Sequence, residues 1–310
     1  MLSRVAESLF WIARNVERAE ALARLLDVTA AHSIDRGGGG REAVARRWDG
    51  IYAVAALPPP EPPVPSYAAE AIERIVFGAD DGRSIAACVR IARRNAVGVR
   101  AELTTEVWEC INGLYLFVEA QSPRALGPDG ASSFLRSVRD TAQAFAGICD
   151  ATLAHDDAWQ FLIVGRYLER ASMTARILRA ADGDGEDGTR WQHLLQACCA
   201  SEPFARAGRQ SSDPQEALAF IALSDVFPRS IRFCVHEVDH ALHRLSGTPA
   251  HTFSNAAERA AGRVASQLDY LAVGDVLQEG PHTFAARATR WLDEIGEAVT
   301  TSYFPRVPVA

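Results

Sequence analysis

The sequence predicts an all-α fold, a single large helical bundle of two pseudo-repeated halves. The stretch 159–178 is apolar on every side when read as a helix, so we expect a buried, central helix there. The pattern R-x-Φ-E-R-A-x4-R-Φ-Φ starts at Arg14 and again at Arg166, a shift of 166 − 14 = 152 residues. No sustained β-alternating run with hairpin chemistry occurs in the chain.

Length and composition limit the class of protein. The chain has 310 residues, of which 48% are hydrophobic, so it can bury a large core. We expect one domain over 1–310, with halves of about 1–154 and 155–310. The net charge of −7 disfavours a nucleic-acid binder. No apolar run reaches the roughly 20 residues of a membrane span, and no signal peptide is recognised, so no membrane association is expected.

The helices of the first half follow from apolar stripes and punctuation. An apolar stripe runs through 2–30, and the glycine-rich connector at 35–40 ends this region. The proline-rich segment 57–65 is a stiff loop, because proline lacks the N–H donor that helices and central strands need. Ser84 is expected to cap a helix. The expected helices are 2–30, a short one around 41–56, 67–77, one after Ser84, about 96–119, and 131–154.

The second half is marked by helix starts. Asp213 followed by proline and a glutamate is a strong helix start, and Asn255 with Glu258 three residues later is another. The expected helices are 159–178, 191–199, one beginning at Asp213, one from Pro228 to Leu245, one from Asn255 to about 271, and roughly 283–303. The six cysteines form no C-x-x-C pair and are expected to be reduced core thiols of a cytoplasmic protein.

Two charged trios stand in the repeated pattern. Each has i, i+3, i+4 spacing and so occupies adjacent helical turns; the trios are Arg14/Glu17/Arg18 and Arg166/Glu169/Arg170. If the two helices pack against each other, the trios converge, and converging arginines favour a carboxylate or phosphate. Further candidate lining residues are Arg100, Glu106, Glu109, Asn112 and Arg232. The alternative is a buried ion network that ties the two halves together.

These motifs resemble the Alpha-E family, a bacterial all-helical family named for its Glu-Arg motif. The similarity starts at the N-terminal M-L-S-R-V-A-E-S-L-F-W-I-A-R-N-V-E-R-A and continues through R-R-N-A (93–96), E-V-W-E-x-x-N (106–112), the stretch 161–176 and L-S-D-x-F-P-R-S-I-R (223–232). It covers essentially the whole chain. The resemblance implies association with ATP-grasp-type ligases, and with transglutaminase-like and proteasome-like peptidase proteins, in peptide or amide-bond synthesis and protein modification.

A zinc-peptidase motif also appears. His236 and His240 fit H-E-x-x-H, with Glu258 as a possible third ligand. However, both histidines lie opposite the apolar stripe of their helix, an Asp between them is unusual for this motif, and the resembled family is not a zinc-peptidase family. We therefore assign no metal site.

Three functions remain open. No GxGxxG, Walker or G-x-S-x-G motif is present, so no cofactor is assigned. The leading hypothesis is a partner of an ATP-grasp-type ligase whose Glu-Arg cluster binds an anionic group. The second is a stand-alone enzyme performing a transferase or ligase step, with Glu17 or Glu169 as the acid–base group. The third is a non-catalytic structural scaffold.

Overall fold

The fold is all-α. The computed structural model describes residues 1–35, 41–61, 66–78, 82–122, 128–180, 189–208 and 213–305, and these ranges contain fourteen α-helices and no strand. The connector expected at 35–40 lies outside the described residues apart from Asp35, and so does the part 62–65 of the proline-rich segment, whereas residues 57–61 form no helix or strand, as expected. The expected all-α class is confirmed.

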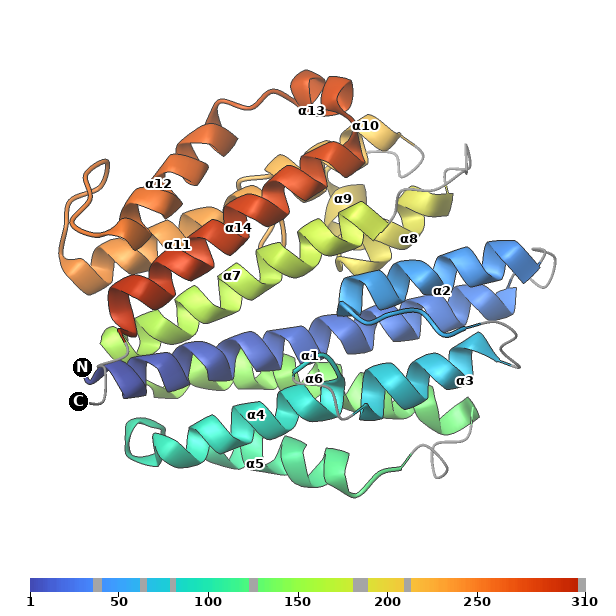
Figure 1. Cartoon of the computed structure of the whole chain (residues 1–310), viewed down its shortest axis with the longest axis horizontal. Coiled ribbons are helices and arrows are strands. Elements are labelled where there is room, and N and C mark those ends of the chain that lie inside the picture. The colour runs from blue at the N-terminus through green and yellow to red at the C-terminus, as the bar shows by residue number, and fades with distance from the viewer. Residues whose placement is uncertain are drawn as a thin grey trace.

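Two long helices form the centre of the molecule. They are α1 (Ser3–Asp35) and α7 (Asp157–Ala180), which pack along each other through the middle of the bundle (Figure 1). Nearly every residue of α7 from Ala158 to Leu178 is buried, because the helix has no polar face. The central position expected for 159–178 is therefore confirmed.

Each central helix has its own set of neighbours. Below α1 in Figure 1 lie α4 (Ile85–Gly98), α5 (Thr105–Glu119) and α6 (Pro128–Thr152). Above α7 lie α11 (Ile231–Ser246), α12 (Ala256–Asp269) and α14 (Pro281–Tyr303). α1 packs on α4 and α6 with α5 outside them, and α7 packs on α11 and α14 with α12 outside them. The division into repeated halves stays a prediction.

Shorter helices complete the bundle. They are α2 (Arg41–Ala55), α3 (Tyr67–Ala71) with the π-helical turn Ile72–Val76, α8 (Thr189–Ala197), α9 (Ser201–Arg206), α10 (Pro214–Leu223) and α13 (Val273–Glu279). The expected caps at Ser84, Asp213 and Asn255 all accept a backbone N–H in the first turn of the following helix. The start expected at Pro228 falls three residues later, because Ser230 caps α11 through the N–H of Phe233.

The single helix expected over 96–119 is wrong. It is interrupted after Gly98 by a 3-10 turn (Arg100–Glu102), and α5 begins only at Thr105. The physical reason is Thr104, whose hydroxyl accepts the N–H of Val107 and starts a new helix. The apolar period continues across this break, so periodicity alone could not locate it.

The crossing of α1 and α7 depends on Gly165. A β-carbon at this position would lie 2.3 Å from the backbone oxygen of Phe10, closer than any van der Waals contact allows. The absence of a side chain therefore lets the two backbones approach closely. This close approach positions the charged trios one helical turn further on.

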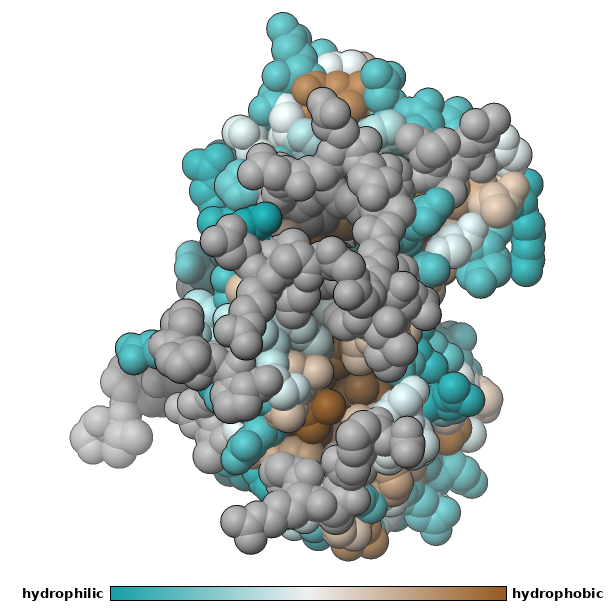
Figure 2. Space-filling view, turned by 90° about the vertical axis from the view of Figure 1, so that its right-hand side faces the viewer, coloured by the Kyte–Doolittle hydropathy of each residue, from teal (hydrophilic) through white to brown (hydrophobic). Residues whose placement is uncertain are grey.

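The surface at one end of the bundle is of mixed polarity (Figure 2), and four of the cysteines lie in the core. Figure 2 shows hydrophilic residues on both flanks of one end of the bundle, with some apolar surface between them. Within the described ranges, none of the helices combines the length and apolarity that crossing a bilayer requires. Four cysteines are buried in the core, and we call them the buried thiols: Cys88, Cys149, Cys198 and Cys234.

Candidate functional site

The charged trios of α1 and α7 meet in the interior. Arg14 Nε donates to Glu169 Oε2 at 2.7 Å. Arg18 binds both oxygens of the same carboxylate, with Nε at 2.6 Å from Oε1 and Nη2 at 3.0 Å from Oε2. Because Arg14 and Arg18 are one turn apart on α1, both reach one carboxylate on α7. The Glu169 side chain is fully buried, so these contacts replace its hydration.

The reciprocal contact joins Glu17 of α1 to Arg170 of α7. Arg170 Nε lies 2.7 Å from Glu17 Oε1 and its Nη2 lies 2.9 Å from Oε2, a bidentate pair. Arg229, just before α11, adds a contact of 3.3 Å to Glu17. Arg166 is also buried, and its Nη2 finds no hydrogen-bond partner among the described residues. Each helix thus supplies a glutamate to the arginines of the other. We call these two groups together the Glu-Arg cluster.

The cluster holds both glutamates in the ionised form. Burial alone would raise the pKa of Glu169, but the Arg18 and Arg14 guanidiniums outweigh it and lower the pKa to about 2. Burial is likewise opposed at Glu17 by Arg170 and Arg229, and its pKa falls to about 2. A carboxylate with so low a pKa is a weak base and is not protonated near neutral pH. The cluster is therefore suited to holding charge in place rather than to transferring protons.

A third buried glutamate extends the network on one side. One oxygen of Glu20 accepts from Arg24 and also forms an ion pair with Arg229 Nη2 at 3.1 Å. Gln143 of α6 adds a longer contact of 3.5 Å to the same oxygen. Glu20 is only 2% exposed, so its charge is compensated within the protein. Both arginines around Glu20 thus have a carboxylate partner.

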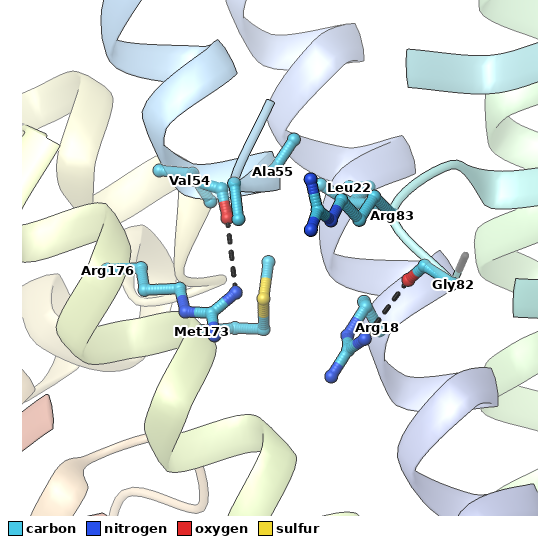
Figure 3. A pocket seen from close by; sticks show the side chains of 9 residues that line it. Arg18, Leu22, Val54, Ala55, Gly82, Arg83, Met173 and Arg176 are labelled. Atoms are coloured by element: carbon cyan, nitrogen blue, oxygen red, sulfur yellow. Dashed lines mark hydrogen bonds between the residues drawn. The ribbon is translucent and has the colours of Figure 1, made fainter. Parts of the chain in front are cut away.

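A pocket of about 170 Å³ lies beside the Glu169 side of the cluster (Figure 3). Arg18 belongs to both, because its Nη1 donates to the Gly82 carbonyl oxygen at 3.0 Å while the rest of its guanidinium holds Glu169. The walls come from α1, the end of α2, the turn before α4, and α7. The lining residues are Arg18, Leu22, Val54, Ala55, Ala56, Gly82, Arg83, Met173 and Arg176.

The pocket carries positive charge without a matching carboxylate. Figure 3 shows Arg176 and Arg83 on opposite sides with their guanidinium groups turned toward the space between them. Within the described residues neither makes an ion pair; Arg176 has only a 3.5 Å contact to the Val54 carbonyl oxygen. Burial lowers the pKa of Arg176, an effect that the more distant Glu169 charge does not overcome. Such a pocket is chemically suited to an anion.

Five sequence candidates lie away from this cluster. They are Arg100, Glu106, Glu109, Asn112 and Arg232. The Arg100 guanidinium stacks 5.5 Å from the Trp108 ring centroid, and Asn112 accepts from Arg93. Glu106 and Glu109 are exposed. Arg232 pairs with Asp269 at 2.9 Å. Among the described contacts, none joins these five to the Glu-Arg cluster.

The H-E-x-x-H residues are engaged elsewhere. His236 Nε2 lies 2.8 Å from Asp269 Oδ1, and the His236 and His240 ring centroids are 6.1 Å apart. Glu258 turns back to its own helix start, where it accepts from Ser254 N at 2.7 Å. Across the described part of the chain, no three His, Cys, Asp or Glu side chains are grouped as a metal site would require.

Sequence reasoning missed Glu20, Arg24, Arg83, Arg176 and Arg229 as site residues. A signal for four of them was present. Arg24 and Arg176 are the last arginine of the repeated pattern that starts at Arg14 and Arg166, and the segments 83–89 and 229–235 both read R-S-I-x-x-C-V, a shift of 229 − 83 = 146 residues. This second internal pattern begins with the two arginines that precede α4 and α11.

The comparisons with known proteins agree with the motif. No curated protein and no solved structure matches the chain. The family model named Alpha-E, described as a predicted alpha-helical domain with a conserved ER motif, matches residues 1–304. The Glu-Arg pairs at Glu17-Arg18 and Glu169-Arg170 lie within this match and at the centre of the fold. The chain therefore belongs to the Alpha-E family.

Proposed function

We propose that this protein binds an anionic group in the arginine-lined pocket and does so as a partner of an ATP-grasp-type ligase. The observation that carries the proposal is the pair Arg83 and Arg176, which face one pocket with no carboxylate partner among the described residues. Arg176 is half-buried, and a bound anion relieves the cost of leaving such a cation unpaired, while the exposed Arg83 adds a second positive charge to the pocket. The cytosol is the expected setting.

The partnership rests on family resemblance. The resemblance to the family implies a role in peptide or amide-bond synthesis or protein modification, in which an ATP-grasp-type ligase acts on a carboxylate or acyl-phosphate. A helical protein with an anion pocket fits the role of holding that group or its carrier. Transglutaminase-like and proteasome-like peptidase proteins are further expected partners.

The scaffold alternative is favoured by one observation, the saturation of the Glu-Arg cluster. Glu169 is bonded to Arg14 and Arg18, and Glu17 to Arg170, so both glutamates of the cluster are already neutralised within the protein. The low pKa values of both glutamates also weaken the case for a stand-alone enzyme that uses them as acid–base groups. In our proposal the cluster is structural and the pocket next to it binds the ligand.

The experiment is a purification from the native host with variants matched in charge. The tagged wild type, Arg176→Gln and Arg179→Gln are purified and the co-purifying proteins identified by mass spectrometry. Arg179 is exposed on the same helix and outside the pocket, so it controls for the loss of one positive charge. The mixtures are then assayed for ATP-dependent amide formation.

We expect an ATP-grasp protein to co-purify with all three forms, and amide formation to be lost only in Arg176→Gln. A wild type that recovers no ATP-grasp protein contradicts the partnership. Equal activity in the two arginine variants contradicts the role of the pocket. Equal melting temperatures of the two variants show that a difference in activity does not come from unfolding.

A further inference from the structure

The surroundings of Glu169 and Glu17 are built from matching contacts. Arg18 holds Glu169 bidentately and donates Nη1 to the Gly82 carbonyl oxygen at 3.0 Å. Arg170 holds Glu17 bidentately and donates Nη1 to the Pro228 carbonyl oxygen at 3.3 Å. In each case one arginine joins the opposite central helix to the turn that precedes α4 or α11.

The two turns match as well. Ser84 and Ser230 each cap the helix that follows and donate to a carbonyl oxygen six residues earlier. One turn into these helices, the Cys88 thiol donates to Gly82 and the Cys234 thiol to Pro228. The residue after each of these carbonyls is an arginine, Arg83 in the first turn and Arg229 in the second.

The pocket wall formed by the end of α2 has a counterpart of the same backbone conformation after α8. α2 is followed by Ala56 with φ +57°, and α8 is followed by Cys199 with φ +56°, both in the left-handed region. After each, a backbone N–H bonds to the carbonyl oxygen five residues earlier, Leu57 to Tyr52 and Ala200 to Leu195. The pocket walls from α1, α7, α2 and the turn before α4 thus have counterparts around Glu17.

The two environments differ at the position three residues after the glutamate. On α1, Glu20 follows Glu17 by three residues and its carboxylate joins Arg24 to Arg229. On α7, the residue three after Glu169 is Ser172, whose hydroxyl donates to the Leu168 carbonyl oxygen of its own helix. The arginines that correspond to Arg24 and Arg229 are Arg176 and Arg83, and they face the pocket.

We propose that the ligand of the pocket is a carboxylate, held between Arg83 and Arg176 as the Glu20 carboxylate is held between Arg229 and Arg24. The protein contains its own example of the bound state, and Ser172, which replaces the glutamate on α7, brings no carboxylate to Arg176. The arrangement suits a carboxylate on a short chain, such as an acidic side chain or the C-terminus of a peptide. This inference rests on the proposed anion-binding function of the same pocket.

The test uses glutarate as a carboxylate probe and inorganic phosphate as the competing anion. Binding to the full chain is measured by calorimetric titration at matched ionic strength. The variant Arg83→Gln is chosen because Arg83 is exposed, so the fold is kept, and Arg179→Gln is its charge-matched control. We expect glutarate to bind more tightly than phosphate, and Arg83→Gln to weaken glutarate binding about tenfold or more, with no change in Arg179→Gln.

A gain-of-carboxylate variant tests the comparison with Glu20 directly. Ser172→Glu places a carboxylate four residues before Arg176, the spacing that joins Glu20 to Arg24. It is expected to lose glutarate binding while its melting temperature stays at or above that of the wild type. Glutarate binding that persists in a folded Ser172→Glu overturns the assignment.

The outcomes separate this inference from the function on which it rests. If phosphate binds with the same dependence on Arg83 and glutarate does not, the pocket is an anion site and the carboxylate assignment is overturned. If neither anion binds, or if Arg83→Gln changes nothing, the proposed function of the pocket fails as well.

Discussion

Neutralising Glu169 is the most direct test of whether the Glu-Arg cluster stabilises the fold. In Glu169→Gln the side chain keeps its size but loses its charge, and Arg14 and Arg18 face each other without the anion between them. Breaking a buried ion pair from one side costs about 3–5 kcal/mol. The pKa of Glu169 gives a similar figure, since a fall from 4.5 to about 2 corresponds to roughly 2.5 × 1.36, or about 3 kcal/mol.

These free energies translate into a measurable change of melting temperature. With about 2.1 cal/mol/K of unfolding entropy per residue, 310 residues give about 0.65 kcal/mol/K. A loss of about 3–5 kcal/mol then lowers the melting temperature by about 5–8 °C. Differential scanning calorimetry of Glu169→Gln against the wild type at neutral pH measures it.

An exposed ion pair of the same length is the control. Arg90 and Glu119 are 2.7 Å apart, but their side chains are 47% and 34% exposed. Such a pair contributes about 0–1 kcal/mol, so Glu119→Gln should lower the melting temperature by less than about 2 °C. If Glu169→Gln and Glu119→Gln have the same melting temperature, the buried cluster does not stabilise the fold and the reasoning is refuted.

Three further predictions follow from the central helices and the core. The pKa values of Glu17 and Glu169 are lower in the folded chain than in the unfolded chain, which therefore binds protons first as the pH falls. The stability that the two ionised glutamates give the fold is thus complete above about pH 4.5 and is lost as the pH falls toward 2. The urea midpoint of unfolding should drop across this range, and less steeply in Glu169→Gln. Gly165→Ala should destabilise the fold by about 1–3 kcal/mol or more, because the added methyl group meets the α1 backbone at 2.3 Å. Gly113 has open space around it, so Gly113→Ala should stabilise the fold by about 0.5–1 kcal/mol, and urea titration measures both changes. Equal effects of the two substitutions would show that the helix crossing tolerates a methyl group. The buried thiols, whose pKa burial raises to about 12, should resist a thiol reagent at pH 8 until urea unfolds the chain, and rapid labelling of the native protein would contradict this.

The spacing of the charged residues along α1 and α7 predicts part of the Glu-Arg cluster. The pattern around Glu17 and Glu169 was visible from spacing, and with it the expectation that the trios converge if the helices pack together. Spacing along one helix fixes which side chains share a face. It does not fix which arginine of one helix reaches which glutamate of the other. That pairing follows from the close crossing at Gly165.

The pocket was beyond sequence reasoning for a different reason. Its charged residues come from α1, α7 and the turn before α4, and Arg83 and Arg176 are separated by 176 − 83 = 93 residues. Neither arginine stands in a motif that by itself predicts a ligand. Their lack of a carboxylate partner is a property of packing, which only the assembled bundle defines. The candidates on α5 were selected from motif similarity, but Asn112 accepts from Arg93 and both Glu106 and Glu109 are exposed.

The sequence by itself determined the fold class, the burial of the helix at 159–178 and the two Glu-Arg pairs, because apolar period and capping residues act over a few turns of chain. It did not determine the break before Thr104, since the apolar period continues through it. Only the tertiary structure decided which charges neutralise each other and which remain open to a ligand. The physical reason is that ion pairing requires approach within about 4 Å, and residues distant in sequence reach that separation only when the helices pack.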